Sequence, residues 1–510
     1  MLSAVLILVG VALTILYIRT KPCKNLPPGP NPLPILGNVK DMPDGTTPEY
    51  QHWIKFKDLY GPISHVSILG QSLIILHDRD AANAILEKTS TKTSGRPQFV
   101  FGNEMCGYNQ ILSFKPYGKL LKQHRKLVHQ QLGTKTAASR FRDIQDVESR
   151  RLLLRILESP EKLFEHIKTE ASAIILKMTY GYNLEPHKPD PLALLIEQMM
   201  HNFSLAFVPM SWPVDVLPIL RYLQKPFQEF DVPYTFVKKQ IAKQSNRPSY
   251  VSSLIKQHDG DLDEETDTAI KQTAAVMYAA GADTTVSSIR GFALAMLLFP
   301  EVQRKAQREI DSVVGTERLP QFEDRDNLPY VDALINESLR WIPVTPMGVV
   351  HTADEDIYYK EFVIPKGASF LPATWWFLHD PEIYSDPASF DPDRYLEPRN
   401  EPHPNFASFG FGRRVCPGRF LADESLFISI SRLLAAFDVK KAVDGRGSEI
   451  EPQISVTPGM ISHIRDFPYE IKPRNEKYAA MMRQVEVDHP WEQADAAFLS
   501  MDVSPEAEKV

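Results

Sequence analysis

The chain has 510 residues, of which 43% are hydrophobic and 24% are charged, and its net charge is −7. A chain of this kind can bury a large core, and its negative charge argues against nucleic acid as a partner. Three cysteines are too few for a disulfide framework, and no Cys-x-x-Cys pair indicates a zinc site. Because no linker or internal repeat divides the chain, we expect one large domain.

The first segment of the chain is apolar. No charged residue occurs from Leu2 to Ile18, and a helix of this length would measure about 25 Å, slightly less than the hydrocarbon core of a bilayer. A secretory signal peptide is the alternative, but a positive n-region and a small-residue cleavage site are missing. Arg19, Lys21 and Lys24 follow the run, which places the remaining chain in the cytosol by the positive-inside rule. The sequence therefore predicts a single-pass membrane anchor.

The following segments predict a mainly α-helical domain with a small β portion. Residues 63–76 have the pattern of two strands around a glycine-containing turn, and most of the remaining chain has helical periodicity. A basic helix is expected at Tyr117–Lys126, which contains His124 and Arg125 and could simply be a solvated face. Residues 199–219 mix Met, Phe, Trp and Pro, and they could be ordinary core.

The longest predicted helix runs from the acidic residues at 263–267 to Phe299, where Pro300 stops it. The hexapeptide Ala-Gly-Ala-Asp-Thr-Thr at 280–285 lies in its middle. Glycine and threonine weaken helical hydrogen bonding, so we expect a local opening there. Asp283 and Thr284 could instead cap a helix start, but the apolar residues on both sides argue against this.

Three later features are weak evidence of a functional role when each is taken alone. Glu337 and Arg340 are spaced i, i+3, so they share one face of a predicted helix. Arg394 lies in the sequence Phe-Asp-Pro-Asp-Arg-Tyr at 390–395. His351 ends the sequence Val-Thr-Pro-Met-Gly-Val-Val-His, and a surface histidine is the ordinary alternative for it.

The most informative stretch is Phe-Gly-Phe-Gly-Arg-Arg-Val-Cys-Pro-Gly at 409–418. Its glycines allow the backbone to approach a bulky group, and its arginines place fixed positive charge beside Cys416. Apolar residues at helical spacing follow, and Pro417 suits the first helical position. A thiol at a helix N-terminus should have a lowered pKa and favour the thiolate, which is the form that ligates metal. A buried structural cysteine is the alternative.

This stretch resembles the haem signature of the cytochrome P450 family, Phe-x-x-Gly-x-Arg-x-Cys-x-Gly. The five specified positions are matched by Phe409, Gly412, Arg414, Cys416 and Gly418. The resemblance implies a cytochrome P450 fold over residues 26–475, with haem b bound through the Cys416 thiolate. We expect a transmembrane anchor in residues 1–25 before this domain and an acidic, weakly ordered tail in residues 476–510 after it.

The resemblance also implies residues at the haem periphery. Arg125, with His124 beside it, would bind a haem propionate, and His351 matches a position that donates to a propionate in related proteins. Leu121 stands where the family usually has tryptophan, which removes one donor to the propionate.

Two further roles follow from the resemblance. Asp283 and Thr284 match the acid–alcohol pair that relays protons during oxygen activation. Glu337, Arg340 and Arg394 match a structural network behind the loop that presents the cysteine.

The activity implied by the resemblance is that of a reductase-dependent monooxygenase. NADPH electrons would arrive through a separate cytochrome P450 reductase, and cytochrome b5 could also donate. One oxygen atom of O₂ would enter an apolar small molecule that reaches the site from the membrane. The resemblance implies that residues 199–219 cover the substrate pocket and dip into the membrane, instead of forming ordinary core. A basic patch near the cysteine side of the haem would suit an acidic electron donor; its members are Lys119, Lys122, Lys126 and Arg413.

The expected location is the endoplasmic reticulum membrane, with the catalytic domain in the cytosol. The sequences at 280–287, 344–351 and 457–463 are most similar to fungal enzymes of secondary metabolism, of the O-methylsterigmatocystin oxidoreductase type. Polyketide, terpenoid and indole-alkaloid substrates all stay open. Two alternatives are a haem-thiolate isomerase or dehydratase that does not use O₂, and a non-catalytic haem- or lipid-binding membrane protein.

Overall fold

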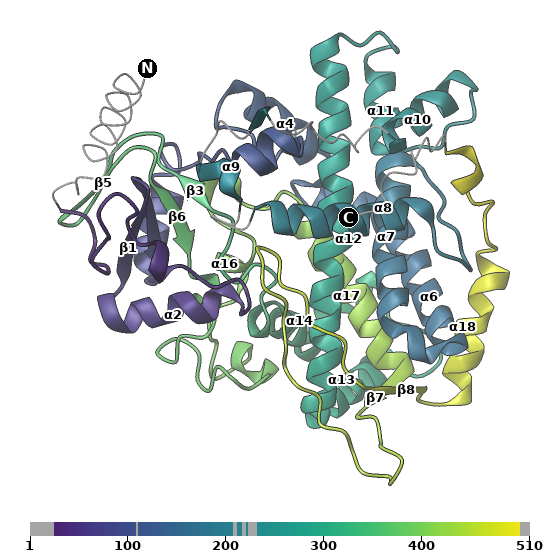
Figure 1. Cartoon of the computed structure of the whole chain (residues 1–510). Coiled ribbons are helices and arrows are strands. Elements are labelled where there is room, and N and C mark those ends of the chain that lie inside the picture. The colour runs from purple at the N-terminus through teal and green to yellow at the C-terminus, as the bar shows by residue number, and fades with distance from the viewer. Residues whose placement is uncertain (1–24, 109–110, 208–211, 217–220, 223–231, 500–510) are drawn as a thin grey trace.

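A computed structural model of the chain describes residues 25–108, 111–207, 212–216, 221–222 and 232–499. The described chain is mostly helical with small sheets, which confirms the predicted fold class. A β-rich part, formed by the N-terminal strands together with strands from residues 351–372, lies beside a larger helical part, and α12 (Glu264–Leu298) runs the length of the helical part (Figure 1).

The other helices and the strands have the following bounds. The longer helices are α2 (Glu49–Tyr60), α4 (Lys119–Leu132), α6 (Arg142–Glu158), α7 (Leu163–Tyr180), α8 (Pro191–Ala206), α10 (Val232–Ala242), α11 (Tyr250–Gln257), α13 (Pro300–Val313), α14 (Pro329–Trp341), α17 (Arg419–Ala436) and α18 (Glu476–Asp488). The short helices are α3 (Arg79–Ala82), α5 (Lys135–Ala138), α9 (Pro213–Val216), α15 (Thr374–Phe377) and α16 (Asn405–Ser408). The strands are β1 (Ile63–Ile68), β2 (Gln71–Leu76), β3 (His351–Thr352), β4 (Ile357–Tyr359), β5 (Phe362–Ile364), β6 (Ser369–Pro372), β7 (Phe437–Lys440) and β8 (Glu470–Pro473).

The strands form one four-stranded sheet and two two-stranded sheets. The larger sheet has the order β1-β2-β6-β3. The predicted hairpin at its edge is confirmed, because β1 and β2 pair antiparallel with Ile63 opposite Leu76. Leu69 and Gly70 both have positive φ at the turn, where glycine is favoured because it lacks a Cβ atom.

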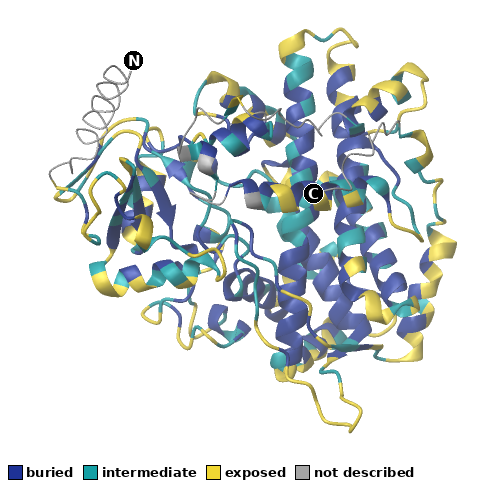
Figure 2. Cartoon of the chain, in the orientation of Figure 1, coloured by how far each residue is buried: buried dark blue, intermediate teal, exposed yellow. Residues whose placement is uncertain are grey.

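Helix α12 has the ends that the sequence predicts. The Asp263 side chain accepts a hydrogen bond from the amide of Thr266 at 2.7 Å, and acidic residues fill the first turn, where the helix dipole favours negative charge. Pro300 begins α13 immediately after the last turn. At about 1.5 Å per residue the helix is roughly 50 Å long, and most of its C-terminal half is buried (Figure 2).

The predicted opening in the middle of α12 is wrong, because the helix is continuous from Glu264 to Leu298. The Thr284 hydroxyl donates to the carbonyl of Ala280 at 2.7 Å, one turn earlier, so it bonds within the helix without breaking it. Gly281 serves packing instead: a Cβ atom there would lie 2.7 Å from Cδ1 of Ile175 in α7. The missing side chain therefore lets α7 approach α12 closely.

The prediction of a weakly ordered tail is wrong for residues 476–499. Asn475 caps α18, and the side chains of Tyr478, Met482 and Val485 are buried where α18 packs on α6. Asp495 accepts a hydrogen bond from the amide of Asn183 at 2.8 Å. Figure 1 shows this segment against the outer side of the helical part. The remainder of the predicted tail lies outside the described residues.

The predicted anchor at Leu2–Ile18 also lies outside the described residues. Within the part of the chain that the structure describes, no single helix combines the length and apolar character needed to cross a membrane. Helices α12 and α13 meet that criterion only as a pair, and they are bent by 106° at their junction.

Candidate active site

The loop that carries Cys416 is tied down by its own backbone. The amide of Cys416 donates to the carbonyl of Phe409 at 2.8 Å. Gly412 has a φ of +54°, and a Cβ atom there would lie 2.5 Å from the carbonyl oxygen of Leu86. Glycine is therefore required at 412 for two reasons: its backbone conformation, and its close contact with the helical segment Asn83–Lys88, which contains Leu86.

Helix α17 begins just after this loop, but one prediction about its start is wrong. Gly418 is the N-cap and Arg419 is the first helical residue, so Pro417 lies before the cap. The amides of Gly418 and Arg419 are directed to the Cys416 sulfur. The expectation that the thiol lies at a helix N-terminus is therefore confirmed.

The expected lowering of the Cys416 pKa is not observed. Burial raises the pKa of this thiol, and the amides of Gly418 and Arg419 with the guanidinium group of Arg125 only partly oppose it. Helix geometry alone therefore does not make this thiol a thiolate. A bound metal cation would, because coordination deprotonates a thiol.

Three guanidinium groups lie near one another beside the loop; those of Arg96 and Arg414 are buried, and that of Arg125 is half-buried. Arg414 donates to the carbonyls of Ser94 and Lys115, both at 2.7 Å. Burial and the charge of Arg125 lower the Arg414 pKa to about 10. Arg96 is also buried, and its pKa is lowered well below the usual value by burial and by repulsion from Arg414 and Arg125.

None of these three cations is neutralised by a neighbouring carboxylate among the described residues. In the described part of the chain none of them has a carboxylate at ion-pair distance, although Asp354 acts on Arg414 from farther away. Arg125 donates to the carbonyl of Val415 in the cysteine loop at 2.8 Å. Buried charges are normally paired, so this cluster is suited to an anionic ligand that contributes more than one negative charge.

Two histidines border the cluster. Both ring nitrogens of His124 are buried and have no hydrogen-bond partner among the described residues, and burial lowers its pKa to about 4. The His351 ring bonds through Nδ1 to the carbonyl of Thr93 at 2.8 Å, and burial and Arg96 hold its pKa well below the usual range. Leu121, in the position expected for tryptophan, is 1% exposed and packs into the core.

A second cluster consists of charged side chains that are paired with one another. Arg340 donates to both carboxylate oxygens of Glu337, at 2.7 and 2.8 Å, and Arg394 donates to Oε1 of the same group at 3.0 Å. All three side chains are 0% exposed. The Tyr395 hydroxyl also donates to Glu337, at 3.0 Å.

This cluster adjoins the cysteine loop through α14 and α16. The Ser408 hydroxyl, one residue before Phe409, donates to the carbonyl of Leu339 at 3.4 Å. Arg340 also donates to three backbone carbonyls between Leu378 and Ser389. Glu337 and its two arginines thus fix the backbone that precedes the loop.

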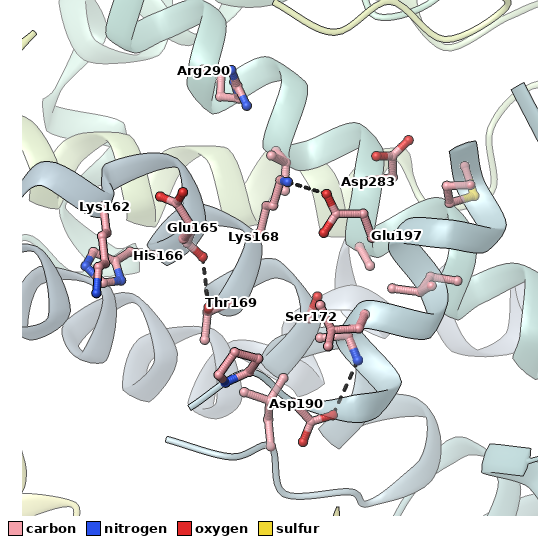
Figure 3. A pocket seen from close by; sticks show the side chains of 18 of the residues that line it. Lys162, Glu165, His166, Lys168, Thr169, Ser172, Asp190, Glu197, Asp283 and Arg290 are labelled. Carbon is pink, nitrogen blue, oxygen red and sulfur yellow. Dashed lines mark hydrogen bonds and ion pairs between the residues drawn. The ribbon is translucent and has the colours of Figure 1, made fainter. Parts of the chain in front are cut away.

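Asp283 and Thr284 lie in the interior of α12, which rules out their role as a helix cap. Helices α12 and α17 pack against each other. Ala282 of α12 and Leu421 in the first turn of α17 belong to one large buried cluster. Asp283 also faces a cavity of about 1180 Å³ between α7, α8 and α12, whose wall includes Lys168, Glu197 and Arg290 (Figure 3).

A helical protein that presents a half-buried cysteine thiol beside unpaired buried cations is built to hold a metal-bearing anionic group. The chain belongs to the cytochrome P450 family, whose model matches residues 27–465. It is 52% identical to "Cytochrome P450 monooxygenase CLM2" of Gibberella zeae, covering 99% of both chains. It is 44% identical to "Multifunctional cytochrome P450 monooxygenase af510" of Aspergillus fumigatus, covering 98% of this chain and 97% of that protein. It is 37% identical to "O-methylsterigmatocystin oxidoreductase" of Aspergillus flavus, covering 93% of both chains.

The residues of the site fit the cofactor of this family. Cytochromes P450 hold haem iron through a cysteine thiolate, and their electrons usually come from NADPH through a reductase. The two propionates of haem would supply the negative charge that Arg96, Arg125 and Arg414 lack. The unpaired nitrogens of His124 offer a further polar contact.

Arg96 was not predicted as a site residue. Its side chain donates to the carbonyls of Ser113, Val349 and Val350, contacts that join parts of the chain far apart in sequence. One signal could have found it, since Arg96 is the only charged residue between positions 93 and 103.

Replacing Arg96 tests its role in binding the cofactor. Arg96→Leu should weaken haem binding by about 10- to 100-fold, because a hydrogen bond to a charged group contributes roughly 1.5–3 kcal/mol. Arg96→Lys keeps the charge and should retain more haem. Haem content per protein and haem transfer to an apo-acceptor measure the effect. Equal haem retention in both variants and the wild type would exclude Arg96 from the site.

Proposed function

We propose that this protein is a haem-dependent monooxygenase of fungal secondary metabolism that inserts one oxygen atom of O₂ into an apolar small molecule. NADPH electrons reach it through a separate cytochrome P450 reductase. The observation that carries the proposal is the position of the Cys416 thiol at the N-terminus of α17, near the guanidinium groups of Arg96, Arg125 and Arg414, which have no carboxylate partner among the described residues. The names of the relatives support the reaction class.

Each group in the site has a distinct task under this proposal. Bound haem supplies the iron at which O₂ is activated. Cys416 is the iron ligand, and the matched residues Phe409, Gly412 and Gly418 shape the loop around it. Arg125 and Arg414, with His124 and His351 at the border, hold the propionates. The network of Glu337, Arg340 and Arg394 is structural and keeps the loop in place.

Asp283 and Thr284 supply protons in this account. Oxygen activation consumes two protons, and a carboxylate next to a hydroxyl can relay them. Their presence also disfavours an isomerase or dehydratase that does not use O₂, because such a reaction has no need of this relay.

Removing the Thr284 hydroxyl should uncouple electron use from product formation. Thr284→Ala is expected to lower product formed per NADPH about 100-fold, at the lower end of the range of general acid catalysis, and to release hydrogen peroxide. Thr284→Ser keeps a hydroxyl and serves as the control. Product, NADPH and peroxide are measured in one reaction. Unchanged coupling in the alanine variant would contradict the proton relay.

An exposed basic surface is suited to the electron donor. Lys119, Lys122 and Lys126 are exposed on α4, and Arg413 is exposed on the cysteine loop. The cations of Lys122 and Arg413 both lie over the ring of Tyr117, at 5.2 and 5.9 Å. This surface joins α4 to the cysteine loop and matches the acidic charge of a reductase or cytochrome b5.

The substrate is proposed to be apolar. The rings of Phe203 and Phe207 pack on Phe114, with centroids 5.7 and 3.8 Å away, and Tyr108 packs against Phe203. Under the proposed function this aromatic group covers the substrate, while Pro209 and Met210 of the same predicted region lie outside the described residues. Polyketides, terpenoids and indole alkaloids are the candidate classes.

We also propose a single-pass anchor in the endoplasmic reticulum membrane, with the catalytic domain in the cytosol. The support is the uncharged run Leu2–Ile18 and the basic residues after it. Deleting residues 1–24 should move most of the protein from the membrane to the supernatant on cell fractionation, because the apolar run is lost. An unrelated single-pass anchor should restore membrane association. If the truncated protein stayed entirely in the membrane fraction, residues 199–219 would be sufficient for membrane association.

The function is tested by comparing metabolites from cells with and without the gene. The compound that accumulates in its absence is then supplied to microsomes containing this protein and a reductase. We expect product only with NADPH and O₂, together with the carbon monoxide difference spectrum of a thiolate-ligated haem. Product formed without NADPH would favour the isomerase or dehydratase, and no turnover with a normal spectrum would favour a non-catalytic haem protein.

A further inference from the structure

The sequence Thr-Pro-Gly-Met-Ile-Ser-His at 457–463 has no role in the site described above. It forms a turn whose flanks are bridged between Val456 and Ile464. The amide of His463 donates to the Thr457 hydroxyl at 3.0 Å, and the amide of Thr457 donates to the carbonyl of His463 at 2.8 Å. These bonds fix the backbone of His463 where the turn meets α12.

The His463 ring contacts two residues on one face of α12. Its Nδ1 atom lies 3.0 Å from the hydroxyl of Ser287, and its Nε2 atom lies 3.4 Å from Oδ2 of Asp283. Oδ2 is buried and has no aligned hydrogen bond among the described residues. The His463 imidazole is therefore the nearest group that could donate a hydrogen bond to Oδ2 of Asp283.

The contacts of Ser287 determine which ring nitrogen carries a proton. The Ser287 hydroxyl also bonds to the carbonyl of Ser462 at 3.0 Å. A carbonyl can only accept, so the single hydroxyl proton is directed to Ser462 and His463 Nδ1 must be the donor to Ser287. Nε2 of a neutral ring then has a lone pair that faces a carboxylate oxygen. The contact between Nε2 and Oδ2 is favourable only when the pair holds one additional proton.

The pair is open to solvent on one side. His463 and Asp283 both line the cavity of about 1180 Å³, and their side chains are 32% and 22% exposed. The wall of this cavity includes Asp283 but, among the described residues, neither Thr284 nor Cys416. Asp283 thus lies between a polar, solvent-connected cavity and the neighbouring Thr284 on the same helix.

We propose that His463 delivers protons from this cavity to Asp283 and holds the Asp283 carboxylate in position for the O₂-dependent reaction. A solvent proton binds Nε2, the N–H bond then breaks as an O–H bond forms on Oδ2, and the ring returns to its neutral form. No electrons move in this step, because NADPH supplies them. The inference deepens the proposed function and rests on it.

A matched set of variants separates proton delivery from a structural role. In His463→Gln the amide can still donate to Asp283, but it cannot take up and release a proton. We expect unchanged haem content and KM, a kcat for product about 100-fold lower, more peroxide per NADPH and a larger solvent deuterium isotope effect. Because His463 acts through Asp283, adding His463→Gln to Asp283→Asn should cause no further loss.

A measurement that does not depend on turnover tests the contact itself. Diethyl pyrocarbonate labels free imidazole nitrogens, and mass spectrometry reads each histidine separately. His463 should be labelled several-fold faster in Asp283→Ala than in the wild type, since Nε2 loses its partner. His201, on the same cavity wall, should be labelled at the same rate in both proteins.

The outcomes distinguish this inference from the function on which it rests. Equal labelling of His463 in both proteins, or full coupling and a normal isotope effect in His463→Gln, would overturn proton delivery while leaving the monooxygenase assignment intact. A wild-type protein that forms no O₂-dependent product would overturn the proposed function and this inference with it.

Discussion

Serine at position 416 is expected to abolish both the thiolate carbon monoxide band and product formation. An alcohol at this place does not ionise beside the iron as a thiol does when it is coordinated. Product formation should fall by more than about 100-fold, because even the outer-shell partners of a metal ligand contribute 10- to 100-fold to affinity or activity. The reduced difference spectrum and turnover of Cys416→Ser measure the two effects.

Cys106 provides the matched control for this change. It is also half-buried and outside any disulfide, but it lies at the end of a short helical segment, Val100–Met105, away from the signature loop. Cys106→Ser should keep the thiolate band. A Cys416→Ser protein that retains this band would refute the ligand assignment.

Loss of Glu337 should have the largest effect on stability. In Glu337→Ala two fully buried guanidinium groups, of Arg340 and Arg394, lose their shared carboxylate. Breaking a buried ion pair by removing one partner costs about 3–5 kcal/mol, a large part of the roughly 5–15 kcal/mol that stabilises a typical native protein. We expect little folded haem protein at 37 °C, as measured by haem content and thermal unfolding.

An exposed ion pair supplies the control for the buried one. Glu476 pairs with Arg483 at 2.9 Å, and both side chains are more than half exposed. Glu476→Ala should cost at most about 1 kcal/mol, since exposed pairs contribute little. Similar unfolding temperatures for Glu337→Ala and Glu476→Ala would show that the Glu337 network is not needed to hold the cysteine loop.

The parts of the fold that were predicted correctly are encoded within short segments. Asp263 and Pro300 mark the ends of α12 because caps and breakers act on the adjacent turn. The hairpin of β1 and β2 follows from alternation around Gly70. The cysteine signature has five specified positions within ten residues, so the candidate ligand could be found without knowledge of distant contacts.

The residues that were missed depend on contacts between distant segments. Arg96 reaches carbonyls more than 250 positions later, at Val349 and Val350, and His463 meets Ser287 across 176 positions. No local pattern specifies such contacts. The thiol pKa was misjudged for a similar reason, because burial of Cys416 by surrounding segments outweighs the helix start that the sequence shows.

The incorrect prediction of a weakly ordered tail at residues 476–499 has a different cause. Its overall composition is polar, but Tyr478, Met482 and Val485 recur at helical spacing and form the buried face of α18. Composition averaged over residues 476–510 concealed this periodicity. An amphipathic stripe in a polar segment is enough to dock a helix when a partner such as α6 is present.

The most direct test of the monooxygenase assignment uses isotopically labelled oxygen. Microsomes containing this protein and a reductase are given NADPH, ¹⁸O₂ and the metabolite that accumulates when the gene is absent. The account predicts a product that carries oxygen from ¹⁸O₂ and none from water, formed only by protein that retains Cys416. Product whose new oxygen comes from water, or that forms without O₂, would contradict it.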